Sequence, residues 1–152
     1  AGGLNLLTPP PPRYDAMAIV AEMISRGLGI PVRITVLRPG DKIDESKVDM
    51  RWGAWGADYP HATAFFTLFM SGAPSNRPGF TDAGYDRLVA QSESTVGDES
   101  DEAIRVAQRI LLGEKVALVP LFHSNNRVIL SGRVKQFSVN PFMDVDFKVI
   151  GL

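Results

Sequence analysis

The pattern of apolar and polar positions predicts a strand, a helix and a second strand over the first third of the chain. Residues 4–8 form a short apolar run that ends at the four prolines 9–12, which neither donate to a sheet nor continue a helix. Asp15 is the expected cap of the helix that follows. Its predicted apolar stripe consists of Ala16, Ile19, Val20, Met23 and Ile24.

Gly27 and Gly29 are expected to end this helix, and the alternating β-branched residues of segment 32–37 indicate the next strand. The order strand, helix, strand is typical of a parallel sheet covered by helices. Residues 38–47 are charged and contain Pro-Gly, which indicates an exposed loop, and residues 48–55 resume extended character. The fold class predicted from this order is α/β.

The rest of the chain predicts three further helices and then strands. Pro60 is the expected first residue of a helix that buries Ala64, Phe65, Leu68 and Phe69. A loop over 71–81 separates it from helices over 82–94 and 100–112, the second capped by Asp98 or Ser100. The apolar run 116–122 predicts a buried strand that holds Pro120 at its end or edge, and shorter strands are expected at 127–130 and 147–150.

Composition and charge narrow the classes of function. With 45% hydrophobic residues in 152 positions, the chain can form the core of one ordinary domain. Its 17 acidic and 16 basic residues nearly cancel, so a nucleic acid is not an expected partner. No apolar run approaches the roughly 20 residues of a membrane helix. Cysteine is absent, which excludes disulfides and thiolate chemistry.

Residues suited to catalysis or metal binding are sparse. The only histidines, His61 and His123, stand in no metal-binding spacing, and we interpret them as polar residues in a first helical turn and at a strand end. The acidic run 98–102 is interpreted as the solvated start of a helix. No serine elbow or phosphate loop occurs. The sequence therefore predicts no enzyme activity, no metal and no cofactor.

The segment "RWGAWGADYP", residues 51–60, holds both tryptophans of the chain just ahead of Asp58. If a strand ends near Trp55, Asp58 lies at the strand's carboxyl end, where open α/β sheets hold ligands. Two interpretations stay open: Asp58 caps the next helix, or it receives an ammonium group beside an indole face. Trp52 and Trp55 would point to opposite faces of a strand, so only one of them is expected in the core.

Five segments resemble, in the same order, those of the peptide and nickel class (family 5) of ABC-importer solute-binding proteins, and within it the dipeptide- and oligopeptide-binding type. They are "DAMAIVAEMISRGLGIPVRITVL", "GAWGADYPHATAFFTLFMSG", "GYDRLVAQSES", "RVAQRILLGEKVALVPLFHSNNRVI" and "VKQFSVNPF". The resemblance implies a periplasmic-binding-protein-like lobe with a mixed sheet flanked by helices. We expect residues 1–152 to be one lobe, the C-terminal part of a two-lobed clamshell. Whether the last strand, about 145–152, belongs with the other lobe is left open.

The resemblance also implies a function and a site. Asp58 is similar to the family's carboxylate that pairs with a peptide's free amino group, and Trp55 to an aromatic wall of that pocket. Gly56, Ala57 and Tyr59 complete the predicted ligand-binding set. Oligopeptide binders can carry a basic residue at the position of Trp52, which we interpret here as packing.

The partners implied are short peptides and the permease subunits of an ABC importer, at the periplasmic or extracellular face of the cytoplasmic membrane. A membrane would be reached only through that permease or an N-terminal anchor outside this chain. Two alternatives remain. One is a ligand-sensing domain of a regulator with the same fold, and the other is a binder of a nickel complex, haem, sugar or opine.

Overall fold

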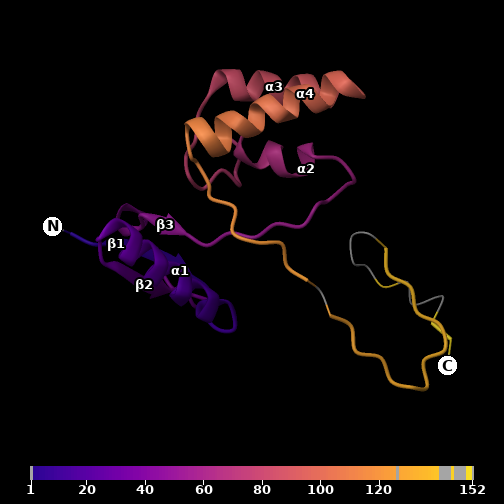
Figure 1. Ribbon diagram of the computed structural model, residues 1–152, viewed down its shortest axis with the longest axis horizontal. Coiled ribbons are helices and arrows are strands. Elements are labelled where there is room, and N and C mark those ends of the chain that lie inside the picture. Colours follow the sequence, from indigo (N-terminus) through magenta and orange to yellow (C-terminus); the bar gives the residue numbers. More distant parts are fainter. Residues whose placement is uncertain (1, 126, 141–144, 146–149, 152) are drawn as a thin grey trace. The chain divides into compact units, whose positions relative to one another are not determined.

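The computed structural model describes residues 2–125, 127–140, 145, 150 and 151 (Figure 1). Contacts within the chain define two compact units, Ala1–Ala54 and Trp55–Leu152. The first unit is a small α/β layer and the second is built on packed helices. The predicted α/β class is confirmed, while the assignment of residues 1–152 to one lobe stays a prediction.

The first unit is a three-stranded parallel sheet in the order β2-β1-β3 (Figure 1). Strand β1 (Leu4–Thr8) pairs with β2 (Val32–Val36) and, on its other side, with β3 (Met50–Arg51). These pairings confirm the predicted strand–helix–strand unit. The sheet is parallel where a mixed sheet is expected, and the antiparallel pairing among the described residues is limited to isolated bridges, Gln136 with Gly151 and Val139 with Val145.

Helix α1 (Arg13–Leu28) covers one face of this sheet, and the apolar stripe that it buries is narrower than the sequence predicts. Met17 and Ala21 are buried beside Leu6, whereas Ile19 and Met23 of the predicted stripe are 63% and 68% exposed. A sheet of three strands offers a helix little width, so only the central row of the apolar face is covered.

The sequence predicts the C-terminal end of α1 but not the residue that caps its N-terminal end. The helix begins right after the prolines with Pro12 at its N-cap, so the prediction that Asp15 caps it is wrong, and Asp15 lies in the first turn. Gly29 ends the helix at φ 66°, as its residue type predicts, whereas the helix continues through Gly27, so the stop predicted there is wrong.

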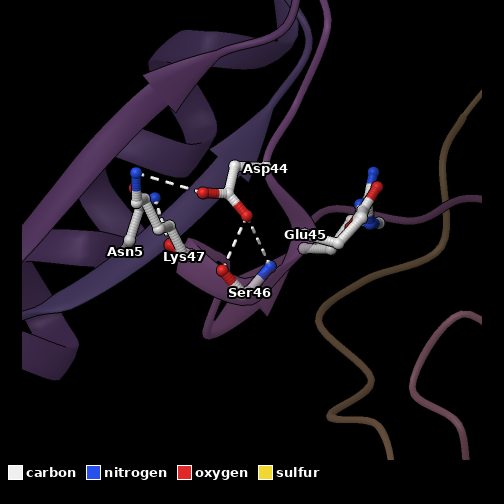
Figure 2. Close-up of polar contacts among 6 residues, drawn as sticks. Asn5, Asp44, Glu45, Ser46 and Lys47 are labelled. Atoms are coloured by element: carbon white, nitrogen blue, oxygen red, sulfur yellow. Dashed lines mark hydrogen bonds and ion pairs between the residues drawn. The ribbon is translucent and has the colours of Figure 1, made fainter.

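The predicted loop at 38–47 is exposed but tied to the sheet (Figure 2). Asn5 of β1 donates from its side chain to the carbonyl of Lys47 at 2.7 Å. The Asp44 carboxylate accepts the hydroxyl of Ser46 at 2.6 Å and pairs with Lys47 at 3.0 Å, and these two contacts hold the pKa of Asp44 below its ordinary value. The loop therefore leads the chain into β3 in a defined register.

Trp52 follows β3 directly and packs beside Met50 against the core of α1 and β1. Its backbone N–H donates to the carbonyl of Leu7 at 2.8 Å, which extends the pairing with β1 beyond the strand. The interpretation of Trp52 as a packing residue is confirmed.

The second unit begins with α2 (Thr63–Phe66) and its 3₁₀ continuation η2 (Thr67–Phe69), followed by α3 (Ala83–Ser94), α4 (Asp98–Gln108) and the π-helical turn η3 (Arg109–Glu114). The prediction that Pro60 starts the first of these helices is wrong, because α2 begins at Thr63. The loop at 71–81 and helix α3 are confirmed. Asp82 caps α3 by accepting the N–H groups of Gly84 and Tyr85 at 2.9 Å, and the bond from Tyr85 is the main cause that lowers the pKa of Asp82.

Tyr85 of α3 is the centre of this unit's core and is fully buried. Its hydroxyl donates to the carbonyl of Phe66 at 2.6 Å, and its ring meets Phe80 edge to face, with centroids 5.1 Å apart. Burial, with a smaller contribution from the nearby Asp86 carboxylate, raises the pKa of Tyr85 well above its ordinary value. One side chain thus links α3, the end of α2 and the loop before α3. The other buried members of this core are Val89, Ala107 and Leu111.

Helices α3 and α4 also meet through buried serines. The hydroxyls of Ser92 and Ser100 lie 2.8 Å apart, and Ser100 donates to the carbonyl of Ser92 at 3.0 Å. Ser100 is therefore inside α4 and is not its cap, and neither is Asp98. The N-cap is Gly97 at φ 64°, a conformation that favours glycine in the short turn between the helices.

The strand predicted at 116–122 does not form. The helical segment runs to Glu114, and Val116 then turns the chain at φ 49°. Val119, Leu121 and Phe122 are exposed, and residues 116–122 form no strand. An apolar run does not specify a strand by itself, because the backbone groups of a strand bond to a neighbouring strand. Residues 127–130 form no strand either, so the prediction that His123 lies at a strand end is wrong. Residues 147–149 of the last predicted strand lie outside the described part of the chain.

No helix in the described ranges is long and apolar enough to cross a membrane.

Tyr85→Phe should lower the free energy of unfolding by about 1–2 kcal/mol, because the buried carbonyl of Phe66 loses its donor while the ring packing stays. Urea unfolding followed by circular dichroism measures this loss. The matched control is Tyr14→Phe, at a half-buried ring outside this core, which should cost less. Equal losses in the two variants would contradict the role assigned to the Tyr85 hydroxyl.

Alkaline pH should destabilise the wild-type protein more than Tyr85→Phe. The folded pKa of Tyr85 is raised above its unfolded value of about 10, so its contribution to stability is complete below pH 10 and is lost as pH rises toward the folded pKa. The expected difference in slope is up to about 1.4 kcal/mol per pH unit above pH 10. Urea unfolding at pH 9, 10 and 11 tests it. Parallel pH profiles for the two proteins would refute the prediction.

Ser92→Ala and Ser100→Ala should each destabilise the protein by about 1–3 kcal/mol, since each leaves a buried hydroxyl or carbonyl without its partner. The double variant should cost less than the sum of the two. Ser94→Ala, at an exposed position of α3, the helix that contains Ser92, serves as the control. Additive losses would mean that the two serines do not interact.

Candidate functional site

The predicted site residues lie in a segment without regular structure between the first unit and α2. The segment runs from residue 55 to residue 59 and contains Trp55, Gly56, Ala57, Asp58 and Tyr59. The indole N–H of Trp55 donates to the Asp58 carboxylate at 3.2 Å. The structure therefore brings together the aromatic residue and the carboxylate on which the predicted site depends.

Asp58 does not cap a helix. Helix α2 starts at Thr63, and its N-cap is Ala62, which makes no side-chain cap bond. The carboxylate is exposed, and among the residues that the structure describes no lysine, arginine or histidine forms an ion pair with it. Of the two interpretations that the sequence leaves open, the helix cap is wrong. The other interpretation, that Asp58 receives an ammonium group, stays a prediction.

The surroundings of Asp58 are open and aromatic. Trp55 and Tyr59 are 52% and 40% exposed, so both rings leave much of their surface uncovered. A Cβ built at Gly56 would meet no heavy atom within 4 Å, so the space beside that backbone is clear. An ammonium group near Asp58 could meet both the carboxylate and an indole face, which together favour cations.

Tyr59 joins this segment to a polar cluster that the sequence does not predict. The Tyr59 hydroxyl lies 3.0 Å from the hydroxyl of Thr63, the first residue of α2, which in turn lies 2.9 Å from Nδ1 of His61. The other ring nitrogen of His61, Nε2, lies 3.4 Å from the hydroxyl of Ser100 in α4. Through Ser100 the cluster continues to Ser92 of α3.

These hydroxyls form the floor of an open hollow of about 490 Å³ within the second unit. Thr63, Ser92 and Ser100 are almost fully buried, while the carboxylates of Glu93 and Asp101 lie exposed in its lining. The hollow adjoins the candidate segment, since Tyr59 and His61 line it as well. Small hydroxyl residues on three helices carry no pattern that predicts their meeting, and only the packing of the helices brings them together.

In the described part of the chain, no three histidines, aspartates or glutamates group in a way that could hold a metal ion. His61 lies two residues before α2 and bonds to Thr63, instead of occupying the first helical turn.

Curated proteins similar to this chain bind peptides according to their names. The chain is 27% identical over 150 residues to the periplasmic murein peptide-binding protein MppA of Escherichia coli. This alignment covers 95% of this chain and 28% of that protein. It is 23% identical over 146 residues to the probable D,D-dipeptide-binding periplasmic protein DdpA of the same species, covering 91% of this chain and 28% of that protein. The chain thus spans between a quarter and a third of the length of these relatives.

Solved structures of peptide-binding proteins are similar to this chain in fold. The substrate-binding domain of an oligopeptide ABC transporter from Bacillus anthracis matches with a TM-score of 0.82 at 23% identity, over 97% of this chain and 30% of that one. The unliganded open form of MppA matches with a TM-score of 0.65 at 25% identity, over 72% of this chain and 22% of that one. No family model matches the chain. The chain is thus similar in sequence and in fold to proteins named for binding dipeptides, murein peptides and oligopeptides.

Proposed function

We propose that this chain is part of the substrate-binding component of an ABC importer that captures short peptides by their free amino terminus. In this proposal Asp58 receives the peptide ammonium, Trp55 forms a wall of the pocket, and Gly56 and Ala57 let the peptide backbone come close. Tyr59 completes the pocket. The reaction class is binding and release, with no covalent step.

One observation carries the proposal: the Asp58 carboxylate is bonded to the indole of Trp55 and does not cap a helix. A carboxylate that accepts a neutral N–H keeps its negative charge for a ligand. The indole N–H also limits the rotation of the carboxylate, so less conformational freedom is lost when an ammonium binds. The similarity to proteins named for binding dipeptides and murein peptides supports a peptide as this ligand.

The energetics make a fixed counter-charge necessary. An ammonium group that leaves water in a closed cleft loses several kcal/mol of hydration unless it meets a carboxylate with good geometry. Removing that carboxylate would leave the ligand's charge uncompensated, so its loss should cost far more than the loss of an exposed surface charge.

The partners in this proposal are short peptides and the permease subunits of an importer. The proposed location is the periplasm or the extracellular face of the cytoplasmic membrane, which the periplasmic relatives support. Because those relatives are binding proteins, no enzyme activity is proposed.

Isothermal titration calorimetry of the full-length gene product tests the proposal, with di- to pentapeptides and their N-acetylated forms as ligands. Asp58→Asn should weaken binding of free peptides about 100-fold, because the neutral amide cannot pair the ammonium. N-acetylation of the peptide should weaken binding to the wild type by a similar factor. In the variant, acetylation should have little further effect, since both changes remove the same ion pair.

The matched control is Asp98→Asn, an exposed aspartate in the first turn of α4, which should leave the affinity within about twofold. Equal binding of free and acetylated peptides would overturn the role of Asp58. Absence of binding by every peptide would overturn the peptide as ligand.

A further inference from the structure

We infer that His61 is a positioning residue for the candidate binding segment 55–59, acting through its neutral tautomer with the proton on Nε2. The consequence for ligand affinity rests on the proposed function, whereas the effect on the segment itself does not. The His61 side chain reaches the predicted ligand-binding residue Tyr59 through Thr63, and its backbone N–H bonds to Tyr59 directly. Its role is to hold the end of the segment against the helices.

The hydrogen bonds of the ring assign the tautomer. The backbone N–H of Thr63 donates to Nδ1 of His61 at 3.3 Å, so Nδ1 carries a lone pair and the proton sits on Nε2. Nε2–H then faces the hydroxyl oxygen of Ser100 at 3.4 Å. Ser100 donates its own hydrogen to the carbonyl of Ser92 and accepts from the Ser92 hydroxyl. Every donor in this chain of bonds has an acceptor.

The same assignment orders the other side of the ring. The Thr63 hydroxyl, 2.9 Å from Nδ1, shares the single lone pair of this nitrogen with the Thr63 N–H, and its oxygen can accept from the Tyr59 hydroxyl at 3.0 Å. The backbone N–H of His61 donates to the carbonyl of Tyr59 at 2.8 Å. Tyr59 is therefore held at two points, by its side chain through Thr63 and by its backbone through His61.

Tyr59 directly follows Asp58 in the chain. The two bonds of Tyr59 therefore fix the position of the backbone next to Asp58. Within the segment, Trp55 and Asp58 bond to each other. Hydrogen bonds from Tyr59 to Thr63, from Thr63 to His61 and from His61 to Ser100 link the segment to the helices. Loss of the His61 ring removes the bond to Ser100 and the acceptor for Thr63 together.

The burial pattern makes this inference testable. His61 is exposed at the rim of the hollow, whereas Thr63, Ser92 and Ser100 beneath it are almost fully buried. A substitution at His61 therefore leaves the buried serine pair in place. Variants at this position should fold and can be compared directly.

Two substitutions separate positioning from the loss of an aromatic ring. Asparagine places its Oδ1 near the position of Nδ1, so His61→Asn keeps an acceptor for the N–H of Thr63. His61→Ala keeps neither the ring nor the acceptor. His123→Ala is the control for a histidine that is exposed and outside the cluster.

The first measurement is the indole N–H resonance of Trp55 in a ¹H–¹⁵N NMR spectrum of the full-length protein. His61→Ala should shift it and leave Trp52, which lies in the first unit, in place. His61→Asn should shift it less, and His123→Ala should leave it unchanged. A Trp55 resonance that stays in place in His61→Ala, or that moves as far in His61→Asn, overturns the inference whether or not peptides bind.

The second measurement is the ratio of affinities for a free and an N-acetylated peptide. His61→Ala should lower the affinity for the free peptide about tenfold and leave that for the acetylated peptide unchanged, since only the ammonium needs Asp58 in place. Asparagine should restore part of the loss. If the wild type discriminates and His61→Ala discriminates equally, the inference is wrong and the proposed function stands. If the wild type binds no peptide, the proposed function fails and the Trp55 resonance decides the inference.

Discussion

Buried hydroxyl groups need hydrogen-bond partners, and this requirement organises the ends of three helices. Thr63 at the start of α2, Ser92 near the end of α3 and Ser100 in the first turn of α4 are almost fully buried. No buried side-chain nitrogen or oxygen in the described residues lacks a partner. Because an unsatisfied buried group costs about 1–3 kcal/mol, few arrangements of these helix ends satisfy all the groups at once. The hollow and the candidate segment beside it depend on that arrangement.

The first unit meets a different requirement, which is the pairing of a central strand on both sides. Strand β1 supplies Leu6 to the face under α1, and its pairing with β2 and β3 buries it between them. The polar contacts of Asn5 with the 44–49 segment secure the short strand β3, which is too short to hold its place alone. Trp52 closes this layer by packing against its core.

The second unit combines a packed core with an exposed segment. Tyr85 is buried and bonded, whereas Trp55, Asp58 and Tyr59 are exposed and held by a few polar contacts. In the proposed function, the exposed aromatic residues of this segment contact the ligand, whereas the buried ones pack the core.

Local sequence determined the strand–helix–strand order, helix α3 with its Asp82 cap, the glycine that ends α1, and the coincidence of Trp55 with Asp58 in one segment. Each of these depends on neighbours within a few residues, which periodicity and residue type report. The tertiary structure alone decided which side of α1 is buried, that Asp58 caps no helix, and that His61 meets Thr63 and Ser100. It also decided that the apolar run 116–122 forms no strand among the described residues. These outcomes depend on partners far along the chain, and a local pattern carries no information about where such partners will lie.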